Sequence, residues 1–324
     1  MISRADALMA FLKRHSWEKA ERHPMAADFS SRHYSRMVND QGQTAVLMDA
    51  EGDQKTGLFV SLAKVLRDLG LCAPEIYGSD PENGFVLMQD FGQRNVGVLL
   101  DQGAEAGPFF LSAADILAKL HRTFDPTAVE GLALPRFDSA LLTDQAGLFL
   151  DAYFPIANSR AASEEERQSF LQAWHDVLGP LDALPQSLLL RDFMPDNLME
   201  LPGGMLGLLD FQDAGLGPVA YDLASLCEEV RHDGGFALLD DVLERYGPTS
   251  EVPLDTLRTA CLLCSAQRHT RILGIIARRS TVQGLCDKFA FLPRIRHHLS
   301  GLLDNEVALA PVKNWFDTFD RLLQ

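Results

Sequence analysis

The sequence predicts an α+β protein with a small sheet-containing lobe followed by a larger, mainly helical lobe. Short apolar runs of strand length fill much of the N-terminal part around one segment with helical periodicity, whereas segments with a 3.6-residue repeat dominate the rest. At 324 residues the chain also exceeds the length at which single cores tend to stop growing, so two lobes are expected. We place them at residues 1–92 and 93–324.

The smaller lobe is predicted to form a sheet with one helix across it. Residues 56–69 show the apolar repeat of a helix, and Leu8, Phe11 and Leu12 share one helical face near the N-terminus. A turn at residues 40–42 separates the first two strands. The predicted strands are residues 25–38, 43–50, 74–77 and 84–88. Residues 89–92 would then connect the two lobes.

The larger lobe is predicted to be helical around a short strand and a hairpin. The apolar run 187–190 indicates a buried strand, and Pro195 prevents regular structure from continuing directly beyond it. Two further apolar runs flank Pro-Gly-Gly at 202–204, which indicates a hairpin that brings Asn197 beside Asp210. The predicted helices are residues 109–124, 163–178, 221–229, 236–246 and 254–278.

Residues 190–197, Leu-Arg-Asp-Phe-Met-Pro-Asp-Asn, carry the most informative chemistry. Asp192 and Asn197 lie in this segment, and Asp210 follows Asn197 by 210 − 197 = 13 positions. In phosphoryl transfer one carboxylate accepts the proton of the attacking hydroxyl, while an amide and a second carboxylate bind magnesium. We therefore predict Asp192 as the catalytic base and Asn197 and Asp210 as Mg²⁺ ligands. The alternative is a structural turn, because Asp and Asn side chains often hydrogen-bond nearby backbone.

Motifs in a consistent order resemble the aminoglycoside phosphotransferase and choline kinase-like family, distant relatives of protein kinases. They are residues 85–91, 117–121, 191–197, 209–211 and 217–224. The resemblance implies a bilobal protein-kinase-like fold, with a nucleotide-binding lobe at 1–92 and a catalytic, acceptor-binding lobe at 93–324. It implies ATP as donor, a small-molecule hydroxyl as acceptor, and a connector at Gln89 and Phe91 that meets adenine. It also implies that Asp222 is structural and caps the helix that follows.

Within this family, segments 30–36, 46–50 and 271–278 are most similar to bacterial kinases that phosphorylate N-acetylmuramate and N-acetylglucosamine at the anomeric hydroxyl. This resemblance implies that Ser30, Ser31, Arg32 and Arg36 contribute to binding of the nucleotide phosphates. The acceptor is therefore expected to be a sugar or amino sugar, either one of these or an aminoglycoside. Whether ATP or GTP is preferred is left open.

Two positions depart from the family pattern. Leu190 stands where the catalytic loop usually has histidine, so packing is expected to steady the loop instead. Met48 stands where kinases place a lysine that contacts the α- and β-phosphates, and methionine cannot neutralise phosphate. Arg32 or Arg36 could supply that charge, or the protein could be a nucleotide-binding scaffold or sensor without turnover. Because the predicted base and both metal ligands are present, we favour an active enzyme.

Composition excludes several other classes of function. The net charge of −16, with a pI near 4.9, argues against nucleic acid or an anionic membrane as the main partner. The negative charge is compatible with a cationic aminoglycoside, but its simpler explanation is that it aids solubility. No signal peptide and no run of about 18 apolar residues is found, so a cytoplasmic protein without a membrane partner is expected. The five dispersed cysteines suit a reducing compartment, and no obligate protein partner is implied.

Isolated cysteines and histidines are given structural interpretations. Cys261 and Cys264 form one CxxC pair inside an apolar helix, so core packing is favoured over zinc binding. His121 ends an apolar helical face and is predicted to be a core residue with a hydrogen-bond partner. His297 and His298 have no Cys or acid at metal-ligand spacing in the sequence, and neither is included in the predicted site.

Overall fold

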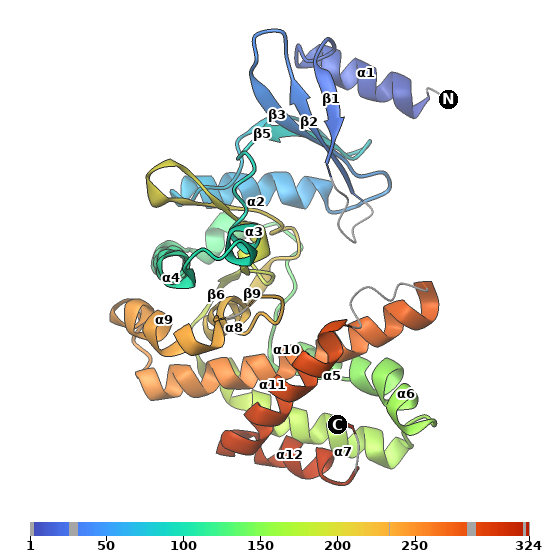
Figure 1. Ribbon diagram of the computed structural model, residues 1–324, viewed down its shortest axis with the longest axis vertical. Helices are drawn as coiled ribbons and strands as arrows, with labels where there is room; N and C mark the ends of the chain where they lie inside the picture. Colours follow the sequence, from blue (N-terminus) through green and yellow to red (C-terminus); the bar gives the residue numbers. More distant parts are fainter. Residues whose placement is uncertain (1–2, 26–31, 233, 284–289, 320–321, 324) are drawn as a thin grey trace. The chain divides into compact units, whose positions relative to one another are not determined.

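The computed structural model describes residues 3–25, 32–232, 234–283, 290–319 and 322–323, which fall into two compact units (Figure 1). The smaller unit contains Met1–Leu99, Asp125–Leu132 and Asp196–Asp213, and the larger contains Leu100–Phe124, Ala133–Pro195 and Ala214–Gln324. The sequence predicts one boundary after residue 92, whereas these units are discontinuous because two later segments return to the smaller unit. Each unit is described by itself.

A five-stranded antiparallel sheet forms the framework of the smaller unit, with strand order β1-β2-β3-β5-β4. Its strands are β1 (Glu21–Pro24), β2 (His33–Val38), β3 (Thr44–Asp49), β4 (Ile76–Asp80) and β5 (Phe85–Gln89). The predicted strand 25–38 begins later, at His33, and residues 26–31 lie outside the described residues. Strand β1 escapes sequence analysis because all four of its residues are exposed and show no apolar alternation.

Both faces of the central strands β3 and β5 are buried, which explains their continuous apolar sequences. Leu47 and Leu87 belong to a core cluster with Phe11 and Leu12 of helix α1 (Arg4–Arg14). Because side chains alternate along a strand, Met48 faces the opposite side. Helix α2 (Thr56–Asp68) contacts β4 and β5 and runs beneath the sheet in Figure 1.

A hairpin of β7 (Leu198–Glu200) and β8 (Leu206–Leu208) also belongs to the smaller unit and confirms the predicted hairpin. Its turn is the short helix η5 (Pro202–Gly204), in which Gly203 and Gly204 have φ of 78° and 76°, a conformation that favours glycine. The smaller unit also contains the short helix η1 (Pro126–Val129). A second short helix, η4 (Pro195–Asn197), begins at the boundary of this unit.

The larger unit is a helical assembly around the long helix α10 (Leu254–Gln283), which contacts α5, α8, α9 and α11. Residues 260–270 of α10 are buried on every side, as expected for a helix in the middle of a bundle. The other helices are α3 (Val96–Asp101, shared with the smaller unit), α4 (Ala106–Thr123), α5 (Ser139–Ala146), α6 (Phe154–Asn158), α7 (Glu164–Leu178), α8 (Ala220–Cys227), α9 (Leu239–Tyr246), α11 (Leu292–Asn305) and α12 (Ala310–Phe316).

Short elements complete the larger unit. Strand β6 (Gln186–Leu189) pairs with β9 (Gly215–Pro218) in an antiparallel ladder. A π-helix, η2 (Phe149–Tyr153), precedes α6, and its Phe149 ring stacks on Phe170 of α7 at a centroid distance of 5.7 Å. The remaining turns are η3 (Gly179–Ala183), η6 (Phe236–Leu238), η7 (Gly247–Thr249) and η9 (Val307–Leu309).

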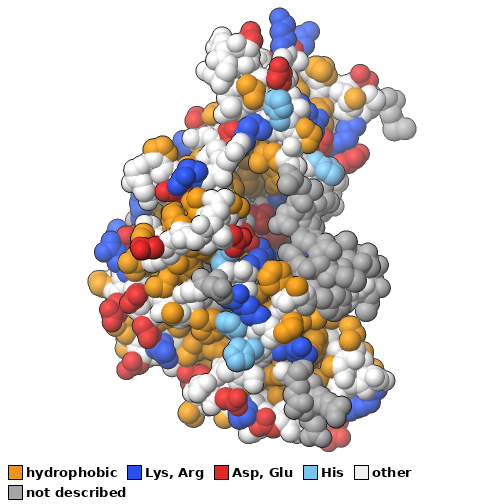
Figure 2. Space-filling view, viewed as in Figure 1, with side chains coloured by type: hydrophobic (Ala, Val, Ile, Leu, Met, Phe, Trp, Pro, Cys, Tyr) orange, Lys and Arg blue, Asp and Glu red, His pale blue; other side chains and the backbone are white. Residues whose placement is uncertain are grey.

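The five helices predicted for the larger lobe are all present, although 236–246 is divided into η6 and α9. The α+β class is confirmed. On the face drawn in Figure 2, acidic and basic side chains are interspersed, as expected for a solvated surface. None of the helices in the described part of the chain combines the length and the apolar character that crossing a membrane requires.

Candidate active site

The predicted metal ligands lie at the same end of the β7–β8 hairpin in the smaller unit. The backbone N–H of Leu209 donates to the carbonyl of Asn197 at 2.9 Å, directly beyond the last ladder pair. Asp210 follows with φ of 57°, in the left-handed region that Asp tolerates better than most residues. The Gln212 amide donates to Asp210 Oδ1 at 2.7 Å. The hairpin therefore positions the backbones of Asn197 and Asp210 as the sequence predicts.

An aromatic stack fixes the segment that follows Asp210. The Phe211 ring lies parallel to Phe59 of α2, with a centroid distance of 4.9 Å and an interplanar angle of 4°. Both rings are buried, so the stack adds specific geometry to the area that they remove from water. The carboxylate of Asp210 is thus carried on a backbone anchored to the helix that crosses the sheet.

Two cations lie in the loops that lead into α2 and β2. The Arg32 guanidinium is almost fully buried and donates from Nε to Asp53 Oδ2 at 2.6 Å. The other oxygen of Asp53 accepts the backbone N–H of Lys55 at 2.8 Å, and the Lys55 ammonium forms an ion pair with Asp213. Burial opposes ionisation of Asp53, but these two donors hold its pKa below the usual range.

Tyr34 interacts electrostatically both with Arg32 and with Asp210, which follows the β7–β8 hairpin that carries the predicted metal ligands (the metal hairpin). Burial raises the pKa of its hydroxyl, the Arg32 guanidinium lowers it, and the nearby Asp210 carboxylate raises it again. Burial has the opposite effect on Arg32 and lowers its pKa, but Asp53 and Tyr34 more than offset this, so that the pKa of Arg32 is raised. Arg32 therefore stays charged beside Tyr34, whose hydroxyl also senses the predicted metal ligand Asp210.

Met48, where kinases usually have lysine, is a core residue with 0% of its surface exposed. A charge is not needed for packing there. Lys55 pairs with Asp213, shortly after the predicted ligand Asp210, and Arg94 pairs with Glu200 of β7. The sequence gives no indication of Lys55, and for Asp213 it leaves open a contact to substrate or, as we favour, completion of a turn. The available signal was the Asp-x-Lys-Thr pattern at 53–56, in which an Asx turn begins α2.

The predicted nucleotide-binding residues are only partly brought together. Arg36 donates from Nε to Asp90 at 2.6 Å and from a terminal nitrogen to the Gly92 carbonyl at 2.8 Å, so it fastens the connector. The Phe91 ring packs on Gly207 of β8, where an added Cβ would lie 2.8 Å from the ring. Gln89 pairs with Glu75 through its backbone N–H at 2.8 Å. Ser30 and Ser31 lie outside the described residues.

The predicted base, Asp192, lies in the larger unit on the loop that leaves β6. Both oxygens of the buried Asp222 carboxylate accept backbone N–H groups from this loop, from Leu190 at 2.6 Å and from Arg191 at 2.8 Å. Burial raises the pKa of Asp222 to about 7, while the two N–H donors and Arg268 act in the opposite direction. Asp222 is structural, as predicted, but the predicted role as a helix cap is wrong because its oxygens bind the loop. Position 222 is already the third residue of α8.

The same loop is held from its carbonyl side. The Arg191 carbonyl accepts from Ser225 Oγ at 3.1 Å and from an Arg268 terminal nitrogen at 3.0 Å. Arg191 itself has φ of 70°, a strained conformation for arginine that these bonds maintain. Leu190 is buried, as the expected packing requires, and this polar network holds the backbone of the loop in addition.

Positive charge surrounds Asp192 within the larger unit. The Asp192 carboxylate interacts electrostatically with Arg268 and Arg271 of α10. Burial lowers the pKa of Arg271, and the neighbouring Arg191 and Arg268 guanidinium groups lower it further. Tyr221 and Asp192 raise the pKa but do not offset this decrease. Among the described residues Arg271 forms no ion pair, and its hydrogen bond goes to the Tyr221 hydroxyl at 3.5 Å.

The chain is similar to known phosphotransferases. Residues 21–258 match the model of the family described as phosphotransferase enzyme family. The N-acetylmuramate/N-acetylglucosamine kinase of Pseudomonas aeruginosa is 32% identical over 90% of this chain and 86% of its own length.

Solved structures share the fold. A choline/ethanolamine kinase family protein from Mesorhizobium loti superimposes with a TM-score of 0.64 at 17% identity, over 96% of this chain and 100% of that chain. An amicoumacin kinase in complex with AMP-PNP and Ca²⁺ gives a TM-score of 0.61 at 16% identity, over 92% and 94% of the two chains. The predicted kinase-like fold is thereby confirmed.

Proposed function

Because this chain belongs to the phosphotransferase enzyme family, we propose that it transfers the γ-phosphoryl group of ATP to a hydroxyl of a sugar or amino sugar. The observation that carries this proposal is the hairpin that holds Asn197 and Asp210 at one end, 197 − 192 = 5 residues after the loop-borne Asp192. The Pseudomonas aeruginosa relative supports N-acetylmuramate or N-acetylglucosamine as acceptor. An aminoglycoside is the further candidate.

Asp192 acts as the base in this proposal. Its carboxylate accepts the proton of the acceptor hydroxyl while that oxygen attacks the γ-phosphorus, and the bond from phosphorus to the ADP oxygen breaks. The hydrogen bonds of Asp222 to Leu190 and Arg191 limit the movement of the loop, so that the carboxylate is positioned before substrate arrives.

The donors on the hairpin fit magnesium. Asn197 offers an amide oxygen and Asp210 a carboxylate, and oxygen ligands from only one or two side chains are typical of Mg²⁺ bound with nucleotide. The complex of the amicoumacin kinase with AMP-PNP and Ca²⁺ supports a nucleotide together with a divalent cation. A bound Mg²⁺ would neutralise charge that develops on the β- and γ-phosphates.

Arg32 and Lys55 are proposed to replace the lysine that is missing at Met48. Arg32 is fixed by Asp53, whereas Lys55 is 53% exposed and shares Asp213 with solvent, so its ammonium can turn toward phosphate. Arg36 is assigned to the connector, where it binds Asp90 and the Gly92 carbonyl. Gln89 and Phe91 remain the proposed adenine contacts, and Ser30 and Ser31 the proposed phosphate contacts.

Measurement of ADP release tests this function. The purified protein is assayed with ATP and Mg²⁺ against N-acetylmuramate, N-acetylglucosamine and an aminoglycoside, and the product is identified by ³¹P NMR. We expect turnover with at least one amino sugar and none when EDTA is in excess. Thermal stabilisation by nucleotide without turnover on any acceptor would instead indicate the scaffold.

The expected location is the cytoplasm, where ATP is available.

A further inference from the structure

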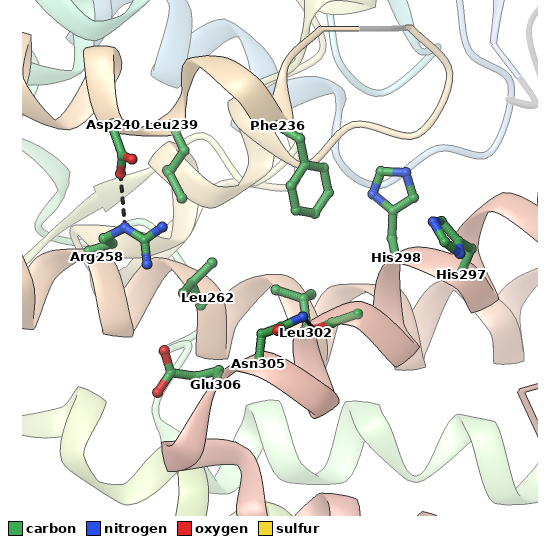
Figure 3. A pocket seen from close by; sticks show the side chains of 11 residues that line it. Phe236, Leu239, Asp240, Arg258, Leu262, His297, His298, Leu302, Asn305 and Glu306 are labelled. Carbon is green, nitrogen blue, oxygen red and sulfur yellow. Dashed lines mark hydrogen bonds and ion pairs between the residues drawn. The ribbon is translucent and has the colours of Figure 1, made fainter.

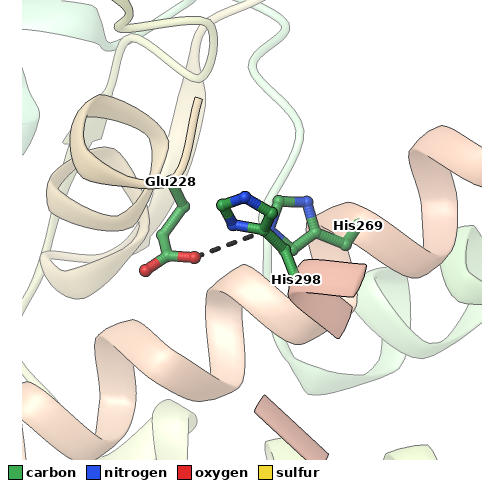
Figure 4. Close-up of side chains that lie close together, drawn as sticks. All are labelled: Glu228, His269 and His298. Carbon is green, nitrogen blue, oxygen red and sulfur yellow. Dashed lines mark ion pairs between the residues drawn. The ribbon is translucent and has the colours of Figure 1, made fainter. Parts of the chain in front are cut away.

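Three potential metal ligands from separate helices lie together in the larger unit, outside the loop of Asp192. Glu228 follows the last turn of α8, His269 lies in the middle of α10, and His298 lies on α11. One ligand atom from each lies within 4.8 Å of the others. Figure 4 shows the three side chains pointing toward one another. Sequence analysis excluded His298 because the other two ligands are distant in the chain.

The side chains of Glu228 and His269 are buried without adequate hydrogen bonding. Each is 1% exposed, and His269 Nε2 lies 3.5 Å from Glu228 Oε2. Among the described residues, neither carboxylate oxygen of Glu228 and neither ring nitrogen of His269 has a hydrogen-bond partner of good geometry. Burial raises the pKa of Glu228 to about 8, and the nearby Ser265 hydroxyl and Arg268 only partly oppose this. Buried polar atoms in native proteins are nearly always satisfied, because an unsatisfied one has lost the hydrogen bonds that it makes to water in the unfolded chain. The cluster therefore needs an additional partner.

A hydrogen bond between the two side chains would satisfy only part of this need. A small approach of His269 to Glu228 would pair one nitrogen with one oxygen and leave the other atoms buried and unpaired. A cation can take a lone pair from the carboxylate and from both imidazoles together. Two imidazoles and one carboxylate suit a transition metal such as Zn²⁺ and are a poor set for Mg²⁺ or Ca²⁺, which prefer oxygen.

A cavity gives the cluster an entry path. His298 is only partly buried and lines a cavity of about 390 Å³ together with His297, Phe236 and Leu302 (Figure 3). The His298 ring also lies against Phe236, with a centroid distance of 4.4 Å, which orients it. A metal with three protein ligands keeps a fourth position for water or a ligand, and His298 is the proposed ligand that lines the cavity.

We propose that Glu228, His269 and His298 bind one Zn²⁺-like ion that joins α8, α10 and α11 and keeps a coordination position open toward the cavity. The site does not depend on the proposed kinase activity. Helix α8 also carries Asp222, which binds the catalytic loop, so the ion would stabilise the helix that positions this loop. The positive charge of Arg268 would repel a cation bound at His269. Its guanidinium donates a hydrogen bond to the Arg191 carbonyl.

Binding of Zn²⁺ alone tests the proposal. The full chain is treated with EDTA, desalted, and titrated with Zn²⁺ by calorimetry in excess Mg²⁺, which occupies oxygen sites. One saturable equivalent and a rise in Tm are expected. Titration with Co²⁺ should give visible bands of a nitrogen and oxygen site without an intense thiolate band, which separates this site from the cysteines. Absence of saturable binding, or a thiolate band, would overturn the proposal.

Two neighbouring histidines provide a matched pair of variants. His298→Ala removes a proposed ligand at a partly buried position, whereas His297→Ala removes an exposed histidine that lines the same cavity. We expect His298→Ala to weaken Zn²⁺ binding by more than the roughly 10–100-fold typical of losing a group outside the ligand set. His297→Ala should bind as the wild type does. Equal effects of the two variants, or no effect of His298→Ala, would contradict the assignment.

A third variant protects the test against misfolding. Glu228→Gln keeps the shape of the buried side chain and removes its charge, so it should fold and lose Zn²⁺ binding together with the Tm increase. Circular dichroism of each metal-free variant verifies the fold. If Glu228→Gln folds and retains wild-type affinity for Zn²⁺, the carboxylate is not a ligand and the proposal fails.

Discussion

The carboxylate of Asp222 accepts the backbone N–H of Leu190 at 2.6 Å, across 32 residues of sequence. Together with its bond to Arg191, this contact links the start of α8 to the loop that carries Asp192. Leu190 stands where related kinases usually have a histidine, so the steadying interaction has a different chemical origin in this chain. The loop is held through its backbone N–H groups, which any residue except proline can provide at position 190.

Substitution of Asp222 should therefore disturb both stability and activity. Asp222→Asn replaces one acceptor oxygen with an NH₂ group that faces a backbone N–H, so we expect a loss of about 1–3 kcal/mol in the free energy of unfolding. The turnover number should fall as the loop loses a fixed position. Urea denaturation and kcat measure the two effects. Asp241→Asn, an exposed acid in the first turn of α9, is the control and should leave both unchanged.

Lys55 should contribute to nucleotide binding more than other lysines of the same helix region. Lys55→Met removes the exposed cation beside the metal hairpin, and the KM for ATP should rise about tenfold, as expected for loss of one charge-assisted interaction of roughly 1.4 kcal/mol. Lys64→Met on α2 removes a lysine that pairs with Asp68 on the same helix. Equal KM values for the two variants would rule out the proposed replacement of the missing lysine.

Arg271 should select an anionic acceptor. N-acetylmuramate carries a carboxylate that N-acetylglucosamine lacks, and Arg271 is a half-buried cation beside Asp192 whose hydrogen bond goes to Tyr221. Arg271→Met should raise the KM for N-acetylmuramate roughly tenfold or more and change that for N-acetylglucosamine little. Arg278→Met, an exposed arginine on the same helix, serves as control. A parallel loss for both sugars would show that Arg271 does not read the carboxylate.

His121 should make the native state sensitive to acid. Its Nδ1 lies 2.9 Å from the Tyr246 hydroxyl, and burial lowers its pKa to about 3 from 6.5. As the pH falls, His121 of the unfolded chain binds a proton at a higher pH than His121 of the native state. The stability contributed by neutral His121 is therefore present above about pH 6.5 and is lost as the pH falls toward 3. Between pH 7 and 5 the wild type should lose about 1–2 kcal/mol more than His121→Gln, measured by urea denaturation. Identical pH profiles would contradict this.

Local patterns in the sequence predict the elements whose burial repeats regularly. The continuous apolar runs of β3 and β5, the repeat of α2, and the Pro-Gly-Gly turn between β7 and β8 all have the predicted type of structure. Cys261 and Cys264 are fully buried, as predicted for core residues. Strand β1 could not be found because its residues are exposed and pair only through the backbone.

Contacts between distant segments explain what sequence analysis missed at the candidate site. The ion pair of Lys55 with Asp213 spans 158 residues, and no spacing rule predicts it. His298 could not be joined to Glu228 and His269 because the three lie on different helices. Asp222 looked like a helix cap because it is an acid near a helix start, but burial directs its oxygens to the Leu190–Arg191 backbone.

The most direct measurement compares two identical substitutions in one loop. Asp192→Asn replaces the proposed base by its near isostere, and Asp196→Asn makes the same change four residues later, at a position without a proposed catalytic role. We predict that Asp192→Asn abolishes Mg²⁺-dependent phosphoryl transfer to the amino sugar while its Tm and affinity for ATP stay near wild type, and that Asp196→Asn remains active. Retained turnover in Asp192→Asn would contradict the account.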